Sequence, residues 1–327
     1  MSASSRASLA IKAALVATAV VSASSLLAQQ QTPPRFAGGT DAILVDVSVT
    51  RAGARVEGLT AADFIVKDSG IVQSAQVVAT DSLPVSLLMA FDASASVRGE
   101  PLNNLKAAAK AAVAALRPND EAALMTFSHS VTLRSGWTTS REALTKAIDG
   151  VTATGLTALN DAAFAALAMA SKPGTRRLVL FFTDGDDTSS WTPGSALIQA
   201  ARRSESVFYN VTLDSARHSV AAISKMLEAT PKPGENLRQD VEQWTMAEPT
   251  LYRGAAMSLI TLETGGETLR AADVARLSPA FVDIVSRFTH RYVLAFTPTG
   301  VPATGWHPLT VEVKGGGDVS ARRGYTR

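Results

Sequence analysis

The sequence contains no cysteine, and only four of its 327 residues are histidine. The absence of cysteine excludes a disulfide framework, an iron–sulfur cluster, a cysteine-ligated zinc site and a thiol nucleophile. No two histidines lie four residues apart, which argues against a histidine-rich metal site on a helix. The histidines are His129, His218, His290 and His307.

The basic and acidic residues nearly balance, so the chain has little net charge. The formal net charge is +2, and charged residues make up 18% of the chain. So small an excess does not suggest a nucleic-acid footprint, which needs lysine and arginine clustered on one face. Hydrophobic residues make up 46% of the chain, enough to bury a large core. This composition excludes a disordered chain, a collagen and a coiled coil.

The first 28 residues have the features of a secretory signal. They carry Arg6 and Lys12 but no acidic residue, and a short apolar run precedes small residues and a polar stretch. This order is typical of an export signal. The apolar run is well short of the ~20 residues that a membrane span needs, and no other stretch is long enough. We expect residues 1–28 to be a signal peptide cleaved after Ala23 or Ala28. The mature protein would then be periplasmic, bound to the cell envelope or extracellular, without a transmembrane span.

Both flanks of the mature chain carry strand patterns. Residues 42–50 alternate apolar and polar side chains, which is typical of a strand. The β-rich runs 63–67 and 71–78 flank a short turn that contains glycine, which predicts a hairpin. Further strand patterns occur after residue 291. Because isolated hairpins are marginal in water, we expect the N-terminal and C-terminal flanks to form one small β-domain.

The middle of the chain alternates between apolar strand runs and helix patterns. The runs 84–91 and 177–182 are mainly apolar without alternation, as in strands buried on both faces. Strands that alternate with helices form the crossover units of a parallel sheet. We therefore predict a doubly wound, mainly parallel α/β domain, with an insertion near 214–250 that breaks the pattern. The predicted organisation is a signal peptide over 1–28, a linker over 29–40, a β-rich module over 41–82, the α/β domain over 83–290 and paired C-terminal strands over 291–327.

Polar side chains follow two of the buried strands at the point where each strand is expected to end. Asp92, Ser94 and Ser96 come directly after the first strand, and Asp184 follows the second. Ligands of open α/β sheets bind outside the carboxyl ends of the strands, where the strand order reverses. Thr157 lies in a glycine-bearing loop that opens a helix, so its hydroxyl can face the same crevice. The sequence thus predicts that these side chains meet at one edge of the sheet.

The predicted site offers two carboxylates and three hydroxyls. These are all oxygen ligands, which suit magnesium, calcium or manganese better than zinc or copper. Magnesium prefers six oxygens in a near-octahedral arrangement. Neutral hydroxyl ligands leave a divalent cation under-neutralised, so one position can accept an incoming carboxylate. We therefore predict Mg²⁺ as the cofactor, with Ca²⁺ or Mn²⁺ as alternatives. The expected partner is a protein that supplies an aspartate or glutamate side chain.

The pattern Asp92-x-Ser94-x-Ser96 followed by Thr157 and Asp184 resembles the metal-ion-dependent adhesion site of von Willebrand factor A-type domains. The resemblance covers about two-thirds of the chain, and the flanks are similar to a bacterial subfamily of exported relatives. It implies that Ser94, Ser96 and Thr157 contact the metal, and that Asp92 and Asp184 act mostly through bound water. It further implies a non-enzymatic module that binds proteins and serves adhesion.

Two other functions remain open from the sequence. A buried strand that ends in Asp92 also resembles the nucleophile strand of phosphoryl-transfer hydrolases, in which an aspartate attacks phosphate. Those enzymes usually carry a second acid two residues later, where this chain has Ser94. They also need a lysine for the phosphate, and Lys172 is expected away from the crevice. The other alternative is a structural envelope protein whose metal ties loops together.

The segment around the second aspartate contains further acidic residues and a tryptophan. Asp161, Asp186 and Asp187 are expected to be solvated or to cap local backbone. Trp191 follows Asp184 closely. It is predicted to be either a core or rim aromatic or an edge of the binding face, since aromatic side chains are enriched at binding hot spots.

Overall fold

The computed structural model describes residues 42–78, 83–169, 171, 173–184, 187–213 and 249–327. The described elements belong to one unit, residues 41–327. The predicted signal peptide, the linker and nearly all of the predicted insertion lie outside the described residues. Within the described part of the chain, no helix combines the length and the apolar character needed to cross a bilayer.

A single sheet organises the α/β part of the chain. Its strands are β6 (Val85–Asp92), β7 (Glu121–Phe127), β8 (Val131–Thr138), β9 (Arg176–Thr183), β10 (Val207–Leu213) and β11 (Thr268–Ala271). They lie in the order β11-β10-β9-β6-β7-β8. The strands from β11 to β7 run parallel, whereas β8 pairs antiparallel with β7 at one edge. Every residue of β6 is buried, which explains the apolar sequence of this strand.

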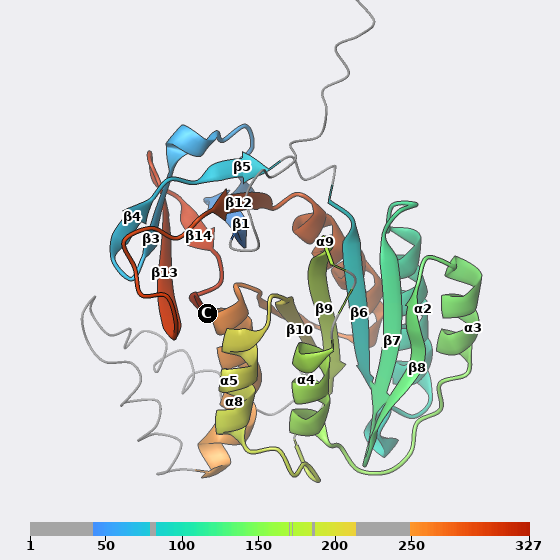
Figure 1. Cartoon of the computed structure of the whole chain (residues 1–327). Helices are drawn as coiled ribbons and strands as arrows, with labels where there is room; N and C mark the ends of the chain where they lie inside the picture. Colours follow the sequence, from blue (N-terminus) through green and yellow to red (C-terminus); the bar gives the residue numbers. More distant parts are fainter. Residues whose placement is uncertain (1–41, 79–82, 170, 172, 185–186, 214–248) are drawn as a thin grey trace, which may run out of the picture. The chain divides into compact units, whose positions relative to one another are not determined.

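Helices cover both faces of this sheet. They are α2 (Glu100–Ala114), α3 (Arg141–Asp149), α4 (Leu159–Ala168), α5 (Gly194–Arg203), α8 (Pro249–Thr264) and α9 (Leu277–Thr289), with single turns η3 (Ala95–Val97) and η4 (Val274–Arg276). Figure 1 shows α4, α5 and α8 on the near face and α2 and α9 on the far face. Two apolar clusters follow this division, one between the sheet and α2, α3 and α9, the other between the sheet and α4, α5 and α8. The prediction of a mainly parallel, doubly wound α/β domain is therefore confirmed.

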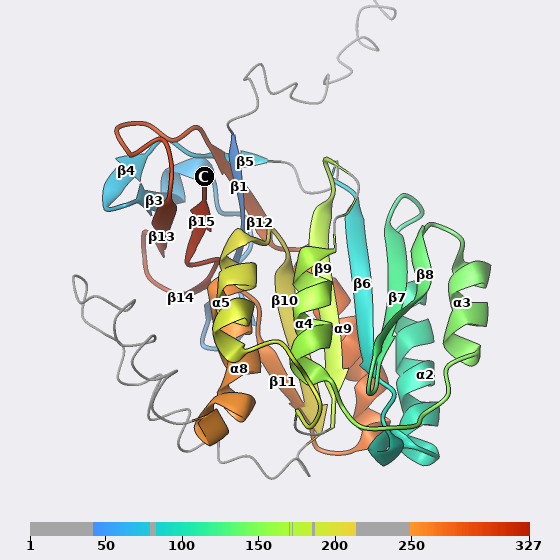
Figure 2. The same cartoon turned by 60° about the horizontal axis from the view of Figure 1, so that its bottom comes forward.

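The strand order reverses at β6. Both β7 and β9 run parallel to β6, and they lie on opposite sides of it. The carboxyl ends of β6 and β9 are therefore neighbours at one edge of the sheet (Figure 2). In open α/β sheets this reversal point is where ligands bind. The fold thus brings the loops that follow these two strands together at this edge.

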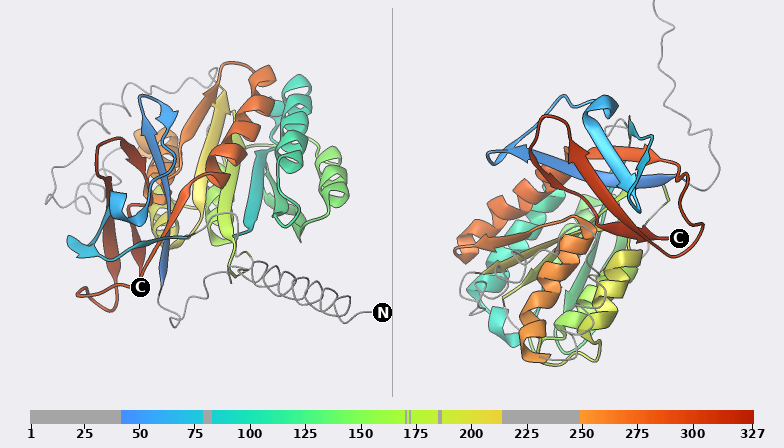
Figure 3. Two further views of the ribbon diagram at one scale, coloured as in Figure 1. Left: turned by 90° about the horizontal axis from the view of Figure 1, so that it is seen from above. Right: turned by 90° about the vertical axis from the view of Figure 1, so that its left-hand side faces the viewer.

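The two flanks form two smaller sheets. One sheet contains β1 (Ile43–Arg51), β2 (Ala54–Arg55), β5 (Gln76–Val78), β12 (Tyr292–Phe296) and β14 (Asp318–Ser320), and the other contains β3 (Phe64–Asp68), which follows the turn η1 (Ala61–Asp63), with β4 (Ile71–Gln73), β13 (Trp306–Val313) and β15 (Gly324–Thr326). N-terminal strands pair with C-terminal strands in both sheets, β1 with β12 and β3 with β13, and Figure 3 shows these blue and red segments side by side. Val45, Phe64, Leu294 and Tyr325 belong to one buried cluster. The two sheets therefore pack into a β-sandwich.

The structure differs from the sequence-based expectation at several strands. The run 71–78 is predicted to be one strand, but it divides into β4 and β5, which belong to different sheets. Only β4 forms the predicted hairpin with β3, whereas β5 pairs with β12. The strands β8 and β11 are not predicted. Strand β8 lies at the sheet edge and has no buried residue. Strand β11 has only four residues. Neither therefore carries a clear apolar pattern.

A buried ion pair links the β-sandwich to the α/β sheet. Arg176, the first residue of β9, pairs with Asp46 of β1. Its guanidinium also donates to the Phe288 carbonyl oxygen (2.8 Å) at the end of α9. Because a buried guanidinium is costly unless its donors are satisfied, this set of acceptors fixes the start of β9 against both the sandwich and α9.

Candidate metal centre

The loop after β6 forms a tight turn around a buried carboxylate. Asp92 is the last residue of β6 and is fully inaccessible to solvent. Its Oδ1 accepts a hydrogen bond from the backbone N–H of Ser94 (2.9 Å), a local turn that aspartate favours. The Oγ atoms of Ser94 and Ser96 lie 2.9 Å apart. The turn thus places a carboxylate and two hydroxyls at the carboxyl end of β6.

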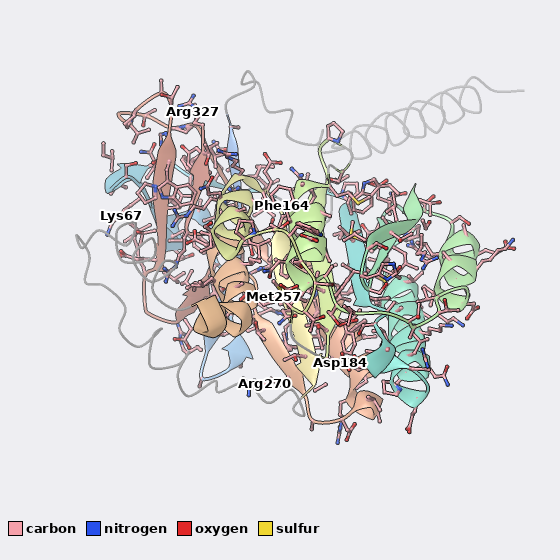
Figure 4. The ribbon with its side chains drawn as sticks, turned by 90° about the horizontal axis from the view of Figure 1, so that it is seen from below. Lys67, Phe164, Asp184, Met257, Arg270 and Arg327 are labelled. Carbon is pink, nitrogen blue, oxygen red and sulfur yellow. The ribbon has the colours of Figure 1, made fainter. Side chains whose placement is uncertain are left out.

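The end of β9 adds the second carboxylate. The Ser96 hydroxyl donates to Asp184 Oδ1 (3.0 Å), and the Thr183 hydroxyl donates to Asp92 Oδ2 (3.0 Å). Four of the five predicted residues therefore form one connected group. Asp184, labelled in Figure 4, is partly exposed and Ser96 is exposed, so the group is accessible from outside.

The loop before α4 carries Thr157 and is fastened to the β6 loop by backbone hydrogen bonds. Ala95 N–H donates to the Gly155 carbonyl oxygen (3.0 Å), and Thr154 N–H donates to that of Ala93 (2.8 Å). Thr157 itself is buried, and its hydroxyl makes no hydrogen bond within the described residues. The structure therefore brings the Thr157 loop next to the group of Asp92, Ser94, Ser96 and Asp184. The Thr157 side chain, however, takes no part in the hydrogen bonds that connect those four residues.

Gly155 occupies a position in the Thr157 loop where a side chain would be disfavoured. It has a φ of +85°, a conformation that favours glycine. A Cβ atom at this position would also lie 2.7 Å from Nδ1 of His129. His129 itself is exposed. It therefore lies beside the Thr157 loop.

Acidic residues near the site fasten the loops around it. Asp187 is buried, and its Oδ1 accepts the N–H of Leu159 (3.0 Å) at the start of α4. The Asp161 carboxylate accepts the N–H of Thr192 (2.8 Å). These two residues are thus neither simply solvated nor caps of their own segment, because each binds a backbone N–H of the other loop. Asp186 lies outside the described residues.

Burial and like charge both act on the two site carboxylates. Burial raises the pKa of Asp92 to about 6, and the nearby Asp184 charge adds to this rise, although the hydrogen bonds from Ser94 and Thr183 oppose it. Burial also raises the pKa of Asp184, against the hydrogen bond from Ser96. A nearby cation would favour the charged form of both groups.

The donor set of this group fits a hard divalent cation. Its side chains offer only oxygen atoms, which suit Mg²⁺, Ca²⁺ or Mn²⁺. Within the described ranges, no group of three or more histidine, cysteine, aspartate or glutamate side chains could hold a metal. A site here would therefore depend on hydroxyl ligands in addition to its two carboxylates, as the sequence predicts.

Sequence reasoning did not identify one functional neighbour of the site. Thr183 donates to Asp92 and so links the ends of β6 and β9, but the sequence analysis gives it no role. The available signal was its position, because it directly precedes Asp184 at the end of a buried strand.

Comparison with known families agrees with this geometry. Residues 87–186 match the family profile of the von Willebrand factor type A domain. The matched segment runs from β6 through β9 and includes all five predicted site residues. This segment of the chain is therefore similar to a von Willebrand factor type A domain. No curated protein matches the chain.

Several solved structures resemble this chain at low sequence identity. Proximal thread matrix protein 1 from the mussel byssus, with a zinc-occupied MIDAS motif, is 16% identical over 68% of this chain and 50% of its own, with a TM-score of 0.49. A von Willebrand factor type A protein from Catenulispora acidiphila is 14% identical over 91% of this chain and 74% of its own (TM-score 0.47). The corresponding domain of the type V pili tip protein Mfa5 from Porphyromonas gingivalis is 12% identical over 62% of this chain and 94% of its own (TM-score 0.45).

These likenesses concern the fold only. The chain spans about half the length of the mussel proteins that it matches.

Proposed function

We propose that this chain is a non-enzymatic, exported binding module that engages an acidic side chain of a protein partner through a divalent metal. The observation that carries the proposal is the connected group of Asp92, Ser94, Ser96 and Asp184 at the reversal point of the sheet. Two carboxylates lie close together there without a cationic side chain within the group. A divalent cation would offset their repulsion.

The metal would be held by all five predicted residues. By resemblance to the family, Ser94, Ser96 and Thr157 are direct ligands, and Asp92 and Asp184 act mostly through water. The bound cation, Mg²⁺ or alternatively Ca²⁺ or Mn²⁺, would supply an electrophilic position for a carboxylate oxygen. The exposed Ser96 and the partly exposed Asp184 leave the outer side of the site open to such a partner.

The environment of Asp92 disfavours the hydrolase alternative. Its carboxylate is fully inaccessible to solvent. Both oxygens already accept hydrogen bonds, Oδ1 from Ser94 and Oδ2 from Thr183. A nucleophile must reach the phosphorus of its substrate, so this aspartate is poorly placed to attack.

The partial exposure of the site also favours partner binding over a metal that only ties loops together. The loops around the site are already joined by protein hydrogen bonds, among them Ala95 N–H to the Gly155 carbonyl oxygen and Thr188 N–H to the Thr157 carbonyl oxygen. A metal is thus not needed to hold them together. Export is part of the proposal because of the basic and apolar N-terminal segment, which is typical of a signal peptide.

Calorimetric titration of Mg²⁺ into the purified protein, with and without a short aspartate-containing peptide, tests the proposal. We expect Mg²⁺ to bind and the peptide to bind only in its presence. Asp92→Ala should abolish both signals without loss of folded structure. Asp149→Ala, which removes an exposed acid on α3, is the matched control and should change neither.

Two results would contradict the proposal. Absence of Mg²⁺ binding to the wild-type protein would remove its basis. Turnover of an aryl phosphate that disappears in Asp92→Asn would support the hydrolase instead.

A further inference from the structure

Two large apolar side chains are exposed beside the candidate metal centre. Trp191 is 95% exposed and Leu156 is 60% exposed. Single exposed apolar residues are common on protein surfaces. Leu156, however, lies in the Thr157 loop itself, and Trp191 lies in the loop after β9, which is hydrogen-bonded to Thr157. We call Trp191 and Leu156 the apolar rim.

Hydrogen bonds between the two loops hold the apolar rim in place around Thr157. The Thr157 carbonyl oxygen accepts from Thr188 N–H (2.9 Å), and Thr157 N–H donates to the Thr188 hydroxyl (2.9 Å). Leu156 directly precedes Thr157, and Trp191 follows Thr188 by three residues. The two rim residues thus flank the point where the loops join.

The backbone that carries Trp191 is fixed to the first turn of α4. The Asp161 carboxylate accepts hydrogen bonds from the N–H groups of Trp191 (3.2 Å) and Thr192 (2.8 Å) and from the Thr192 hydroxyl (2.6 Å). In return, Asp161 N–H donates to the Ser190 hydroxyl (3.1 Å). The indole is therefore presented to solvent from an ordered backbone. A partner that covers it loses little loop entropy on binding.

A positive charge lies on the same edge. Arg98 is exposed, and its guanidinium donates to the Ala153 carbonyl oxygen (3.5 Å) in the loop that leads to Thr157. No carboxylate among the described residues forms a salt bridge with it. An acidic partner would therefore meet a complementary charge next to the metal position.

We propose that the apolar rim selects partners in which a large apolar side chain lies close to the metal-binding acid. This inference rests on the proposed function, because the acid has to reach the metal. The acidic residue binds at the metal, Arg98 favours its approach, and the neighbouring apolar side chain packs against Trp191 and Leu156. Aromatic side chains in such positions commonly dominate the affinity of an interface. The partner is thus an acidic segment that contains a leucine, methionine or aromatic residue next to its aspartate or glutamate.

Selection from a random dodecapeptide phage library tests this inference. The purified full chain is immobilised in Mg²⁺, and the bound phage are eluted with a chelator. We expect the eluted peptides to be enriched in aspartate or glutamate with a large apolar residue within two positions. Trp191→Ala should abolish the apolar enrichment while the acidic enrichment persists. It should also weaken a selected synthetic peptide by about tenfold or more, with an unchanged Mg²⁺ affinity.

Matched variants test whether the loss of peptide affinity is specific to the apolar rim. Leu156→Ser should weaken the same peptide, whereas Val72→Ser, on the β-sandwich and 64% exposed, should not. Phe164→Ala removes another exposed aromatic, 41% exposed on α4, and serves as the control for Trp191→Ala.

The outcomes separate this inference from the proposed function. Acidic peptides without apolar enrichment would overturn the rim while leaving the metal site in place. Absence of any chelator-eluted peptide would count against the proposed function itself. Metal-dependent dimerisation of the wild-type protein that Trp191→Ala abolishes would identify a second copy of the chain as the occupant and would overturn the inference of an acidic peptide partner.

Discussion

Asp68 of the β-sandwich and Asp92 of the α/β domain are both fully inaccessible to solvent, but their surroundings are opposite. Asp68 accepts hydrogen bonds from the hydroxyls of Tyr325 (2.7 Å) and Ser69 (3.0 Å) and lies 3.1 Å from Nδ1 of His307. The His307 and Tyr325 rings also stack on each other. Every group around Asp68 is thus a donor or a group able to carry positive charge.

Asp92 lacks such compensation. It accepts hydrogen bonds from Ser94 and from the Thr183 hydroxyl, and the charged group that acts on it is another carboxylate, Asp184. A buried carboxylate whose hydrogen bonds are all supplied by protein groups stabilises the fold. One that faces a like charge and an accessible edge is better suited to bind a cation. The contrast predicts that the same substitution has different effects at the two positions.

The largest effect is expected from Asp68→Asn. An amide leaves only one acceptor oxygen for Tyr325 and His307, so at least one buried polar group loses its partner. We expect the free energy of unfolding to fall by about 4 kcal/mol, measured by urea denaturation. The matched variant Asp92→Asn should cause no loss of stability at neutral pH in chelator, because it removes a buried charge and its repulsion with Asp184. Equal losses at both sites would contradict the comparison.

The second effect concerns pH in the absence of metal. Because the pKa of Asp92 is about 6 in the folded protein, against 3.8 as its ordinary value, the folded state retains a proton that the unfolded state loses. The contribution of protonated Asp92 to the free energy of unfolding is therefore fully present below pH 4 and is lost as the pH rises through 6. We expect the wild-type protein to lose about 3 kcal/mol across this range relative to Asp92→Asn. Denaturation in chelator at pH 4 to 7 measures this difference. Parallel curves for the two proteins would show that Asp92 does not titrate as described.

The third effect is the stabilisation by magnesium at neutral pH. A ligand at about a hundred times its Kd stabilises the state that binds it by roughly 2.7 kcal/mol. We expect a matching rise in unfolding free energy for the wild-type protein and for Asp68→Asn, but none for Asp92→Asn. Thermal or urea unfolding with Mg²⁺ and with chelator provides the measurement. A magnesium response that survives in Asp92→Asn would locate the metal elsewhere.

The smallest effect is expected at Thr157. Its hydroxyl is predicted to be a ligand, but it takes no part in the hydrogen-bonded network of the other four residues. Thr157→Ala should therefore weaken Mg²⁺ binding by about tenfold, or about 1.4 kcal/mol, with little change in stability in chelator. Thr157→Ser retains the hydroxyl and should bind Mg²⁺ nearly as the wild-type protein does, as measured by calorimetry. If both variants bind equally well, Thr157 is not a ligand.

The sequence was sufficient to predict much of the α/β domain because its signals are local. Apolar runs mark the buried strands, and the rule that ligands bind at strand ends led from β6 and β9 to Asp92 and Asp184. The assignment of all five residues as metal ligands stays a prediction. The role of Thr183 was missed, since a threonine at a strand end has no distinctive pattern.

The β-sandwich was harder to predict in detail. Both of its sheets combine strands from opposite ends of the chain. The division of residues 71–78 between the sheets therefore depends on distant partners. The cluster of Asp68, His307 and Tyr325 unites residues more than 230 positions apart. No local spacing indicates such a cluster, because it arises only from the tertiary arrangement.

The pairing of β5 with β12 has a consequence for how such a chain could be built. Val78 at the end of β5 lies opposite Val293 near the start of β12, although the whole α/β domain separates them along the chain. The chain therefore leaves the β-sandwich for the α/β domain and returns from it at neighbouring positions on two paired strands. A short bridge between these two strands would keep every strand pair of both small sheets. Gene fusion or excision at this junction would therefore exchange the α/β domain for another domain while preserving both sheets of the β-sandwich.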